Sequence, residues 1–346
     1  TLVYSSEKPK NIIIMIGDGM GINYVSTNVI SDPNSPFRKF KFIGLSNTSS
    51  LDKLITDSGA GGTAIATGYR TRNGYISVDT LGNNLKSIFD YAEELNKSTG
   101  VVVTSSVTHA TPATFIANVN DRKKETEIAK QFYDEPLEVV IGGGLKFFTP
   151  KSIGGAREDE IDLTKKLVTN GYSVFTDINS LMTNTVSNKF YALLDSAALN
   201  PTLDRNYFLP ELIQKAIEQL SKNKNGFVLM IEGSQIDWAG HDNNSAALLA
   251  ETNEFSNAVN YVLEFAKNDG KTLVLVTSDH ETGGMSINGG TLSGENLDLR
   301  FTSKGHTAEM VGVFAFGPSA ENFSGVYNNY FIGRNLIWLL KPSVVF

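Results

Sequence analysis

Residues 11–21 read NIIIMIGDGMG, an apolar run followed directly by a glycine-rich segment, and this combination indicates the fold class. Ile12 to Ile16 form a short, continuous run of apolar side chains rich in β-branched isoleucine. Such a run is typical of a strand buried on both faces, as in a parallel sheet with helices on either side. Gly17 to Gly21 follow at once, and they place Asp18 just beyond the end of the predicted strand.

The same kind of apolar run recurs along the chain. Five further runs are found at 100–105 (GVVVTS), 137–142 (LEVVIG), 226–231 (GFVLMI), 272–278 (TLVLVTS) and 311–316 (VGVFAF). Between the runs, apolar residues recur at helical spacing at 83–96, 210–222, 245–267 and 330–340. This alternation predicts an α/β fold with a central, mostly parallel sheet and helices on both faces.

Two segments depart from the alternation. Residues 146–206 are polar, contain Gly154-Gly155 and have no clear strand run, so we expect a helical or loop insertion within a single domain that spans 1–346. Residues 286–305 are rich in glycine and asparagine and are expected to form a short surface loop between two strands.

Length, charge and cysteine content limit the classes of function. A chain of 346 residues buries a large core without covalent cross-links. Its 30 basic and 37 acidic residues give a net charge of −7, which argues against nucleic-acid binding as a function and against a polybasic membrane anchor. The absence of cysteine excludes disulfides, thiolate metal ligands and a cysteine nucleophile. No apolar stretch approaches the roughly 18–20 residues of a membrane helix.

Side chains that can bind metal ions follow four of the predicted strands. They are Asp18; His109 and Thr111; Glu232, Asp237 and His241; and Asp279 and His280. The carboxyl ends of parallel strands lie along one edge of a sheet, where ligands bind, so we expect these groups to converge there. Histidine and aspartate without sulfur suit zinc, whereas aspartate, glutamate and threonine suit magnesium.

Spacing adds to the metal prediction, although each residue also has an ordinary structural explanation. Asp237 and His241 are four residues apart and share one face if their segment is helical. His306, in the sequence GHT, brings all four histidines into the pattern. A single histidine is usually a surface residue or a hydrogen-bonded core residue, and an aspartate after a strand is often a helix cap. The clustering of these groups is what indicates a metal site.

Residues 56–64 read TDSGAGGTA and form the second candidate site. Small residues let the backbone approach a ligand closely, and we expect residues 64–67 to open a helix whose amino end attracts an anion. Ser58 is placed to attack phosphorus, provided that something lowers the pKa of its hydroxyl. Taken alone, the same residues fit a glycine-rich turn capped by Ser58. The residues around Ser58 do not match the nucleophile elbow of α/β-hydrolases, and Gly17, Gly19 and Gly21 miss the spacing of a dinucleotide-binding loop.

The joint occurrence of five motifs resembles the alkaline phosphatase family. IGDGMG (16–21), DSGAGGTA (57–64), EGSQIDWAGH (232–241), SDHETGG (278–284) and GHT (305–307) occur in the family's order, and the resemblance, to a cold-active bacterial member, extends from about residue 10 to residue 340. It implies a phosphate monoester hydrolase with a phosphoserine intermediate. In that mechanism a metal-activated serine attacks in line, and metal-bound hydroxide then releases inorganic phosphate, after an alcohol has left.

The resemblance also implies roles for individual residues. Ser58 matches the nucleophile, Arg122 matches the arginine that grips the phosphate, and Asp57 stands beside the nucleophile. The matched metal ligands are Asp237, His241 and His306 for one zinc ion; Asp18, Asp279 and His280 for a second; and Asp18, Thr111 and Glu232 for magnesium. Lys123 and Lys124 flank Arg122, and these three residues also fit a solvated basic surface.

Two positions depart from the best-known bacterial pattern. His109 stands where aspartate is common beside the magnesium, so we expect the third site to accept zinc as well as magnesium, because imidazole suits zinc better. Trp238 stands where lysine is common near the phosphate. Because tryptophan carries no charge, the product phosphate is expected to be held less tightly.

The resemblance implies partners, location and temperature behaviour too. It implies phosphate monoesters as substrates, inorganic phosphate as a product inhibitor, a homodimer, no membrane partner, and a periplasmic or secreted protein. A first residue Thr1 fits a removed leader or a trimmed sequence. Residues 286–305 correspond to a short crown-like loop. Only 10 prolines, with 22 lysines against 8 arginines, are compatible with cold adaptation.

Two other classes of function stay open on the sequence alone. The first is a sister enzyme of the same architecture, such as a phosphodiesterase or a phosphoglycerate mutase. A sulfatase is disfavoured because the C/S-x-P-x-R segment is absent. The second is a metal-stabilised binding protein without turnover.

Overall fold

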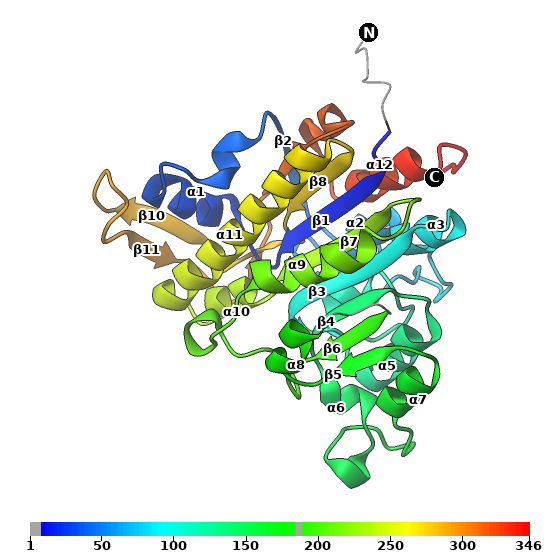
Figure 1. Ribbon diagram of the computed structural model, residues 1–346. Helices are drawn as coiled ribbons and strands as arrows, with labels where there is room; N and C mark the ends of the chain where they lie inside the picture. The colour runs from blue at the N-terminus through cyan, green and yellow to red at the C-terminus, as the bar shows by residue number, and fades with distance from the viewer. Residues whose placement is uncertain (1–7, 185–188) are drawn as a thin grey trace.

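The structure, a computed structural model, describes residues 8–184 and 189–346. Within these residues, ten strands form one main sheet with helices on both faces (Figure 1). The strand order across the sheet is β14 (Gly325–Asn328), β2 (Phe42–Asn47), β13 (Val311–Phe316), β8 (Thr272–Thr277), β1 (Asn11–Gly17), β7 (Phe227–Gly233), β3 (Ser98–Ser106), β4 (Val139–Gly143), β6 (Phe190–Leu193) and β5 (Ser173–Phe175). The predicted α/β fold is confirmed.

The main sheet is mostly parallel. Among the described strands, β13 is antiparallel to both of its neighbours, β2 and β8, and the other neighbouring strands are parallel. The chain between β8 and β13 contains no helix that would return it to the opposite edge of the sheet. It therefore re-enters the sheet from the carboxyl edge of β8, which reverses the direction of β13.

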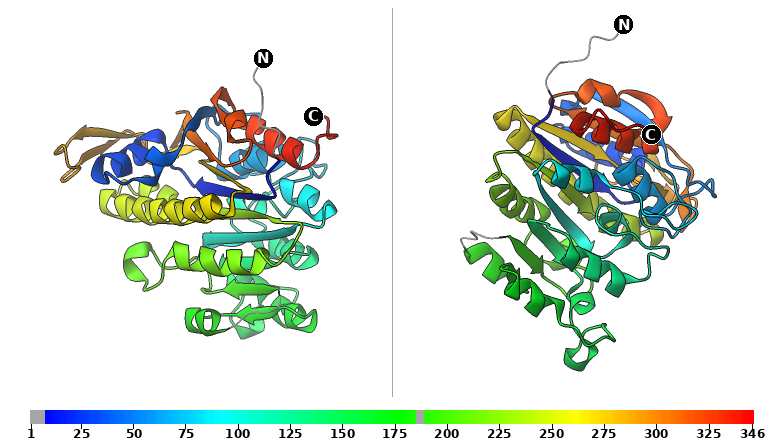
Figure 2. Two further views of the ribbon diagram at one scale, coloured as in Figure 1. Left: turned by 45° about the horizontal axis from the view of Figure 1, so that its top comes forward. Right: turned by 90° about the vertical axis from the view of Figure 1, so that its right-hand side faces the viewer.

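Alternate residues of β1 pack into two separate cores, one on each face of the sheet. Ile12, Ile14 and Ile16 belong to one core, and Ile13 and Met15 belong to the other. All five side chains are fully buried, which explains why the run is continuously apolar rather than alternating. Figure 2 shows the resulting layers from two further directions.

The helices divide between these two cores. One face is covered by α2 (Ser58–Thr67), α3 (Ile88–Glu94), α4 (Ala110–Ala113), α5 (Glu125–Asp134), α6 (Leu145–Phe148), α7 (Leu163–Thr169) and α12 (Tyr330–Leu340). The other is covered by α1 (Ile22–Ser31), α8 (Ile178–Thr183), α9 (Leu209–Leu220), α10 (Gln235–His241) and α11 (Ser245–Asp269). Short 3₁₀ helices span Pro36–Lys39, Lys151–Ile153, Thr202–Asp204 and Ala320–Phe323.

Residues 146–206 contribute two strands to the main sheet, although the sequence pattern shows no strand there. β6 pairs in parallel with β4, and β5 pairs in parallel with β6 at the edge of the sheet. The strands are only four and three residues long, so neither produces a long apolar run. Residues 185–188, inside this segment, lie outside the described residues.

Residues 286–305 form a hairpin rather than an irregular loop. β10 (Met285–Gly289) pairs antiparallel with β11 (Asp298–Phe301), and the hairpin projects beside α1 (Figure 1). Asn23 of α1 donates a hydrogen bond of 2.8 Å to the Met285 carbonyl, which attaches the base of the hairpin to the body. A smaller pair joins β9 (Glu281–Thr282) to β12 (His306–Thr307).

No helix in the described part of the chain combines the length and apolar character that crossing a membrane requires.

Candidate metal centre and nucleophile

The four strands that precede the predicted metal ligands lie side by side at the centre of the sheet. Their order is β8, β1, β7 and β3, and all of them are parallel. The residues that follow these strands therefore meet at one edge. Among the described residues, three groups of three side chains each bring their candidate ligand atoms within 4.8 Å of one another. All three groups consist of residues expected from the sequence.

The first group consists of Asp237, His241 and His306. Asp237 and His241 are one turn apart on α10, as the spacing predicts, and His241 Nε2 lies 3.4 Å from Asp237 Oδ1. His306, on β12, places its Nε2 3.1 Å from His241 Nε2. The Nδ1 atoms of the two histidines face the backbone carbonyls of Lys304 and Thr56, at 2.5 and 2.9 Å. Carbonyl partners of this kind keep Nε2 free for a metal ion.

The second group consists of Asp18, Asp279 and His280, and all three side chains are fully buried. His280 Nε2 lies 3.4 Å from Asp18 Oδ1 and 3.3 Å from Asp279 Oδ2. Neither of these two carboxylate oxygens has a hydrogen-bond partner among the described residues.

The third group consists of Asp18, His109 and Glu232. Thr111 Oγ1 donates a long hydrogen bond of 3.4 Å to Asp18 Oδ2, so the threonine expected here also lies at the group. Within the described chain, Glu232 Oε1 and His109 Nδ1 are buried without hydrogen-bond partners. The side chain of His109 is thus part of the group itself rather than merely adjacent to it.

Burial and mutual repulsion make several of these carboxylates difficult to ionise. Burial raises the pKa of Asp18 well above its usual value, and the negative charges of Asp279 and Asp237 raise it further. Burial likewise raises the pKa of Asp279 to about 6 and that of Glu232 to about 7. Such shifts show that the folded chain holds these acidic groups close together at a cost in free energy.

Asp237 and the histidines respond differently. Burial raises the pKa of Asp237, but the hydrogen bond with His241 and the positive charges of nearby histidines outweigh it and leave that pKa below its usual value. The same hydrogen bond raises the pKa of His241 to about 9. Burial lowers the pKa of His280, His306 and His109 to about 4, so these rings are neutral at pH 7.

These residues fit divalent metal ions. Unpartnered oxygens of buried carboxylates face one another in the second and third groups, and a buried polar atom without a partner is costly. Neutral imidazole and ionised carboxylate are the forms in which these side chains bind metals. A cation would thus satisfy the free oxygens and remove the repulsion between the carboxylates.

Ser58 lies at the first position of α2, beside the second group. Its Oγ is buried and lies 3.2 Å from His280 Nε2. Asp57 caps the helix by accepting a hydrogen bond of 3.0 Å from the Ala60 N–H. The helix therefore begins at Ser58 rather than near Ala64, and Asp57 is the cap rather than Ser58. The early start follows from the aspartate cap, which outweighs the low helix propensity of the glycines after it.

The glycines after Ser58 are required by close packing. A Cβ on Gly61 would lie 2.8 Å from the Asp279 carbonyl oxygen, a contact with rigid backbone that real Cβ atoms do not make. Gly61 therefore lets α2 approach the end of β8, and this approach brings Ser58 to His280.

Arg122 is held next to Ser58 by Asp57. Its Nη1 donates a 3.0 Å hydrogen bond to Asp57 Oδ2, and its Nη2 lies 3.4 Å from His109 Nε2. The ion pair is partly exposed, so the guanidinium can also reach a ligand. Trp238 packs edge-on against the His109 ring, with centroids 6.1 Å apart. The structure thus brings every residue expected at the site into one region.

Two residues that the sequence analysis did not single out also support the site. Thr282 donates its hydroxyl hydrogen bond to Asp237 and lies 3.3 Å from His280 Nδ1. Glu281 is buried and accepts hydrogen bonds from the N–H groups of Gly284 and Met285 and from the Thr307 hydroxyl, next to His306. Both residues follow Asp279-His280 directly in SDHETGG, and that position is the signal that could have identified them.

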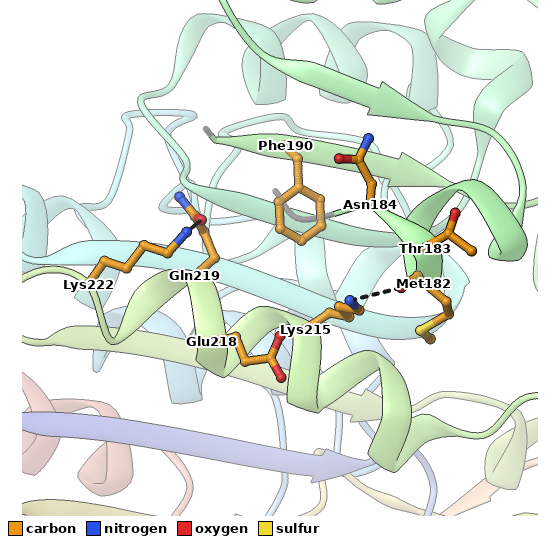
Figure 3. Close-up of a pocket in the computed structure, with 8 residues that line it drawn as sticks. All are labelled: Met182, Thr183, Asn184, Phe190, Lys215, Glu218, Gln219 and Lys222. Carbon is orange, nitrogen blue, oxygen red and sulfur yellow. Dashed lines mark hydrogen bonds between the residues drawn. The ribbon is translucent and has the colours of Figure 1, made fainter. Parts of the chain in front are cut away.

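A hollow elsewhere in the protein shares no residue with this site. It measures about 290 Å³ and lies between α8, β6 and α9 (Figure 3). Lys215 donates a 3.1 Å hydrogen bond to the Met182 carbonyl across it, which is the dashed line in the figure. None of its lining residues belongs to the three metal-binding groups.

Comparison with known proteins places the site in context. The sequence model of the family described as alkaline phosphatase matches residues 9–299. Alkaline phosphatase 3 of Bacillus subtilis is 31% identical over 98% of this chain and 91% of its own length. Alkaline phosphatase 4 of the same organism is 38% identical over 80% of this chain, and the match spans only 62% of that relative.

The solved structure of alkaline phosphatase from the Antarctic bacterium TAB5 superposes with a TM-score of 0.88 at 38% identity, covering 97% of this chain and 98% of that one. A variant of that enzyme, in which a histidine is replaced by aspartate and magnesium is bound in the M3 site, superposes with a TM-score of 0.89 over 97% of this chain and 99% of the variant.

Proposed function

This chain belongs to the alkaline phosphatase family, and we propose that it is a metal-dependent phosphatase that hydrolyses phosphate monoesters. The observation that carries the proposal is the position of Ser58. Its Oγ lies at the amino end of α2, 3.2 Å from His280 Nε2 and beside the Arg122–Asp57 ion pair. A potential nucleophile, a phosphate-binding cation and two metal-binding groups are thus brought together.

The proposed reaction proceeds through a phosphoserine. Ser58 Oγ forms a bond to phosphorus while the bond from phosphorus to the alcohol oxygen breaks, so the alcohol leaves first. A water molecule then displaces the serine oxygen, which releases inorganic phosphate and restores the hydroxyl. In each step the entering oxygen approaches phosphorus from the side opposite the leaving oxygen.

The chain's own residues bind and orient the phosphate. The Arg122 guanidinium is planar and can donate two parallel hydrogen bonds to phosphate oxygens, while Asp57 fixes its direction. The amino end of α2 also favours a negative charge next to Ser58. Trp238 and His109 border the same space as uncharged rings. Few side chains are left to recognise the alcohol portion, so a broad range of monoesters is expected.

We assign two zinc ions and one magnesium ion, with zinc as the alternative in the third site. Asp237, His241 and His306 would hold the first ion, and Asp18, Asp279 and His280 the second. The third would be held by Asp18, Glu232, Thr111 and His109. When bound, such ions would lower the pKa of the serine hydroxyl and stabilise the charge on the leaving oxygen.

Assembly, location and temperature range are parts of the same proposal. We propose one domain, a homodimer, a periplasmic or secreted location and cold activity. Leu51, Leu54 and Ile55 precede Ser58 and expose their apolar side chains, which supports a contact between copies near the site. Sedimentation tests the dimer, and rapid loss of activity on mild heating tests the cold activity.

The decisive experiment uses a labelled phosphate monoester. After an acid quench we expect a phosphorylated chain whose label maps to Ser58. Hydrolysis of p-nitrophenyl phosphate should be abolished by a chelator and by Ser58→Ala. Ser46→Ala is the matched control, because Ser46 is a buried serine on β2 outside the site. A label at another residue, or faster hydrolysis of a diester than of a monoester, would contradict the proposal.

A further inference from the structure

Ser234 occupies the position of a helix cap and does not act as one. It directly precedes α10, where a serine hydroxyl normally accepts a hydrogen bond from a backbone N–H of the first turn. Its side chain makes no such bond, and its backbone is in the helical region, with φ −72° and ψ −29°. The side chain is completely buried. The hydroxyl therefore serves another partner.

That partner is Glu232. Ser234 Oγ donates a 2.7 Å hydrogen bond to Glu232 Oε2. Ser105, on the neighbouring strand β3, places its own Oγ 3.3 Å from the same carboxylate oxygen and 3.0 Å from Ser234 Oγ. Two buried hydroxyls, one on β3 and one just before α10, thus converge on one oxygen of one glutamate.

The two hydroxyls differ in how firmly they donate to Glu232. Ser105 Oγ also lies 3.0 Å from the Ser106 carbonyl oxygen, which shares its single proton, so Ser234 is the firmer donor. Ser234 Oγ accepts a 3.0 Å hydrogen bond from the Ser105 backbone N–H, so its single proton is available for Glu232. The bond to Glu232 Oε2 is shorter than the distance to Ser105 Oγ, so the proton of Ser234 is directed to the glutamate. Ser234 is itself fixed in place, because its backbone N–H donates a 2.9 Å hydrogen bond to Thr104 Oγ1.

The other oxygen of Glu232 is left without a partner. Oε1 makes no hydrogen bond within the described residues, and it is the oxygen available to the group formed with Asp18 and His109. A glutamate side chain has three rotatable bonds, so an unheld carboxylate could turn either oxygen, or both, toward a metal ion. The two hydroxyls remove this freedom by occupying Oε2.

We propose that Ser234 and Ser105 are positioning residues for the third metal ion, acting as a pair of hydroxyls that clamp Glu232 Oε2 and direct Oε1 alone toward the ion. This inference rests on the proposed function, because it assumes that Glu232 binds a metal. Ser234 carries the larger part of the effect, since its hydrogen bond is the shorter one.

The test measures metal affinity separately from catalysis. Stripped wild-type protein and variants are reloaded with two equivalents of zinc per chain, and magnesium binding is then followed by calorimetry while total metal per chain is measured by mass spectrometry. We expect Ser234→Ala to weaken the third site about 10- to 100-fold, the usual effect of losing a residue that orients a metal ligand. Zinc in the other two sites should stay unchanged. The thermal midpoint of the stripped protein should fall somewhat, because the buried Ser105 N–H loses its acceptor. Ser46→Ala should match wild type.

Two further variants distinguish the effect of losing a hydroxyl from the effect of altered packing. Ser105→Ala should weaken the third site by less than Ser234→Ala, and it decides the question if Ser234→Ala does not fold. Ser234→Thr keeps the hydroxyl and should restore most of the affinity. Equal third-site affinity in wild type and both alanine variants overturns the clamp, and so does an equal loss in Ser234→Thr and Ser234→Ala. Wild-type protein that binds only two ions per chain at saturating metal also overturns the clamp. If that protein still hydrolyses p-nitrophenyl phosphate, the proposed function is unaffected.

Discussion

His109 contributes the nitrogen atom to the third metal-binding group, in which the other side chains offer oxygen atoms. Its ring lies among Asp18, Glu232, Arg122 and Trp238, and burial lowers its pKa to about 4. A neutral imidazole is a nitrogen donor that favours zinc, whereas magnesium prefers oxygen ligands. One side chain therefore influences which ion the group selects.

Replacing His109 by aspartate should shift that selection. We expect His109→Asp to raise the affinity of the third site for magnesium relative to zinc, by on the order of tenfold, because a carboxylate oxygen replaces a nitrogen. Competitive dialysis followed by metal analysis measures the ratio. His109→Asn supplies an oxygen without the charge and should lie between the two. An unchanged ratio in His109→Asp would show that the side chain does not determine selectivity.

We expect Trp238 to influence the binding of product phosphate rather than the binding of metal ions. It places an uncharged ring against His109, near the cation of Arg122. Trp238→Lys adds a positive charge close to where phosphate binds, so we expect inorganic phosphate to inhibit about 5- to 10-fold more strongly. Steady-state inhibition at constant ionic strength measures this. Trp238→Met removes the ring without adding charge, and stronger inhibition in that variant as well would assign the effect to space rather than to charge.

For individual residues, the sequence predicts which side chains belong to the site better than it predicts what those side chains contact. Asp18, Glu232 and Asp279 are found because each follows an apolar run, and the carboxyl ends of parallel strands must meet. Ser234 and Ser105 are not found, because a hydroxyl becomes significant only when its partner is known. Ser234 looks like an ordinary helix cap in the sequence, and only its missing capping bond distinguishes it.

Among the elements, α2 and its neighbours determine where Ser58, the proposed nucleophile, lies. Its ten residues are all buried, and Gly61 touches the end of β8. The sequence shows that small residues are needed there. It does not show where the helix begins, because the Asp57 cap competes with unfavourable glycines and the outcome depends on the contacts of Asp57 with Gly74 and Arg122.

The α3–β3 contact contains a titratable group away from the site. Glu93 of α3 accepts a 2.7 Å hydrogen bond from the Thr99 hydroxyl on β3, and burial raises its pKa from 4.5 to about 7. Between these two values the folded state holds a proton that the unfolded state has lost. The contribution of Glu93 to the free energy of unfolding should therefore fall as the pH rises from about 4.5 to about 7, and stay constant above that range.

Glu93→Gln tests this dependence. Glutamine can still accept the Thr99 hydrogen bond but cannot ionise, so the variant should lose less stability than wild type between pH 5 and pH 8, by about 1–3 kcal/mol. Urea unfolding at the two pH values gives the difference. Glu295→Gln, at an exposed side chain of the hairpin, is the control. Parallel pH profiles for wild type and Glu93→Gln would contradict the expectation.

Element length decides which strands the sequence could predict. The runs that become β1, β3, β7 and β8 are six to nine residues long and fully buried, so they stand out. β5 and β6 are shorter, and β6 is recognised as part of the sheet only through its pairing with β4. The strands β10 and β11 are partly buried, and their apolar residues alternate with polar ones, so neither strand contains a continuous apolar run.

In the molecule as a whole, the metal-binding groups lie at the ends of the four central strands. β8, β1, β7 and β3 also form the middle of both hydrophobic cores, so the most buried part of the fold terminates in a cluster of acidic side chains. Folding must overcome the burial of these carboxylates and their mutual repulsion, which raise the pKa values of Asp18, Asp279 and Glu232. Bound cations would attract the carboxylates and so offset their mutual repulsion.

Removing metal ions should consequently destabilise the whole protein rather than only its active site. An ion that binds the folded state alone contributes about 2.7 kcal/mol at a free concentration 100 times its dissociation constant. We expect chelation to lower the thermal midpoint in one cooperative transition, because the affected residues connect the central strands of a single sheet. Calorimetry of wild type before chelation, after chelation and after reloading with zinc and magnesium measures the change. Chelator already saturated with zinc is the control. A midpoint that stays constant while metal analysis shows complete removal would mean that the acidic cluster is stable without cations, and would separate the stability of the fold from its proposed chemistry.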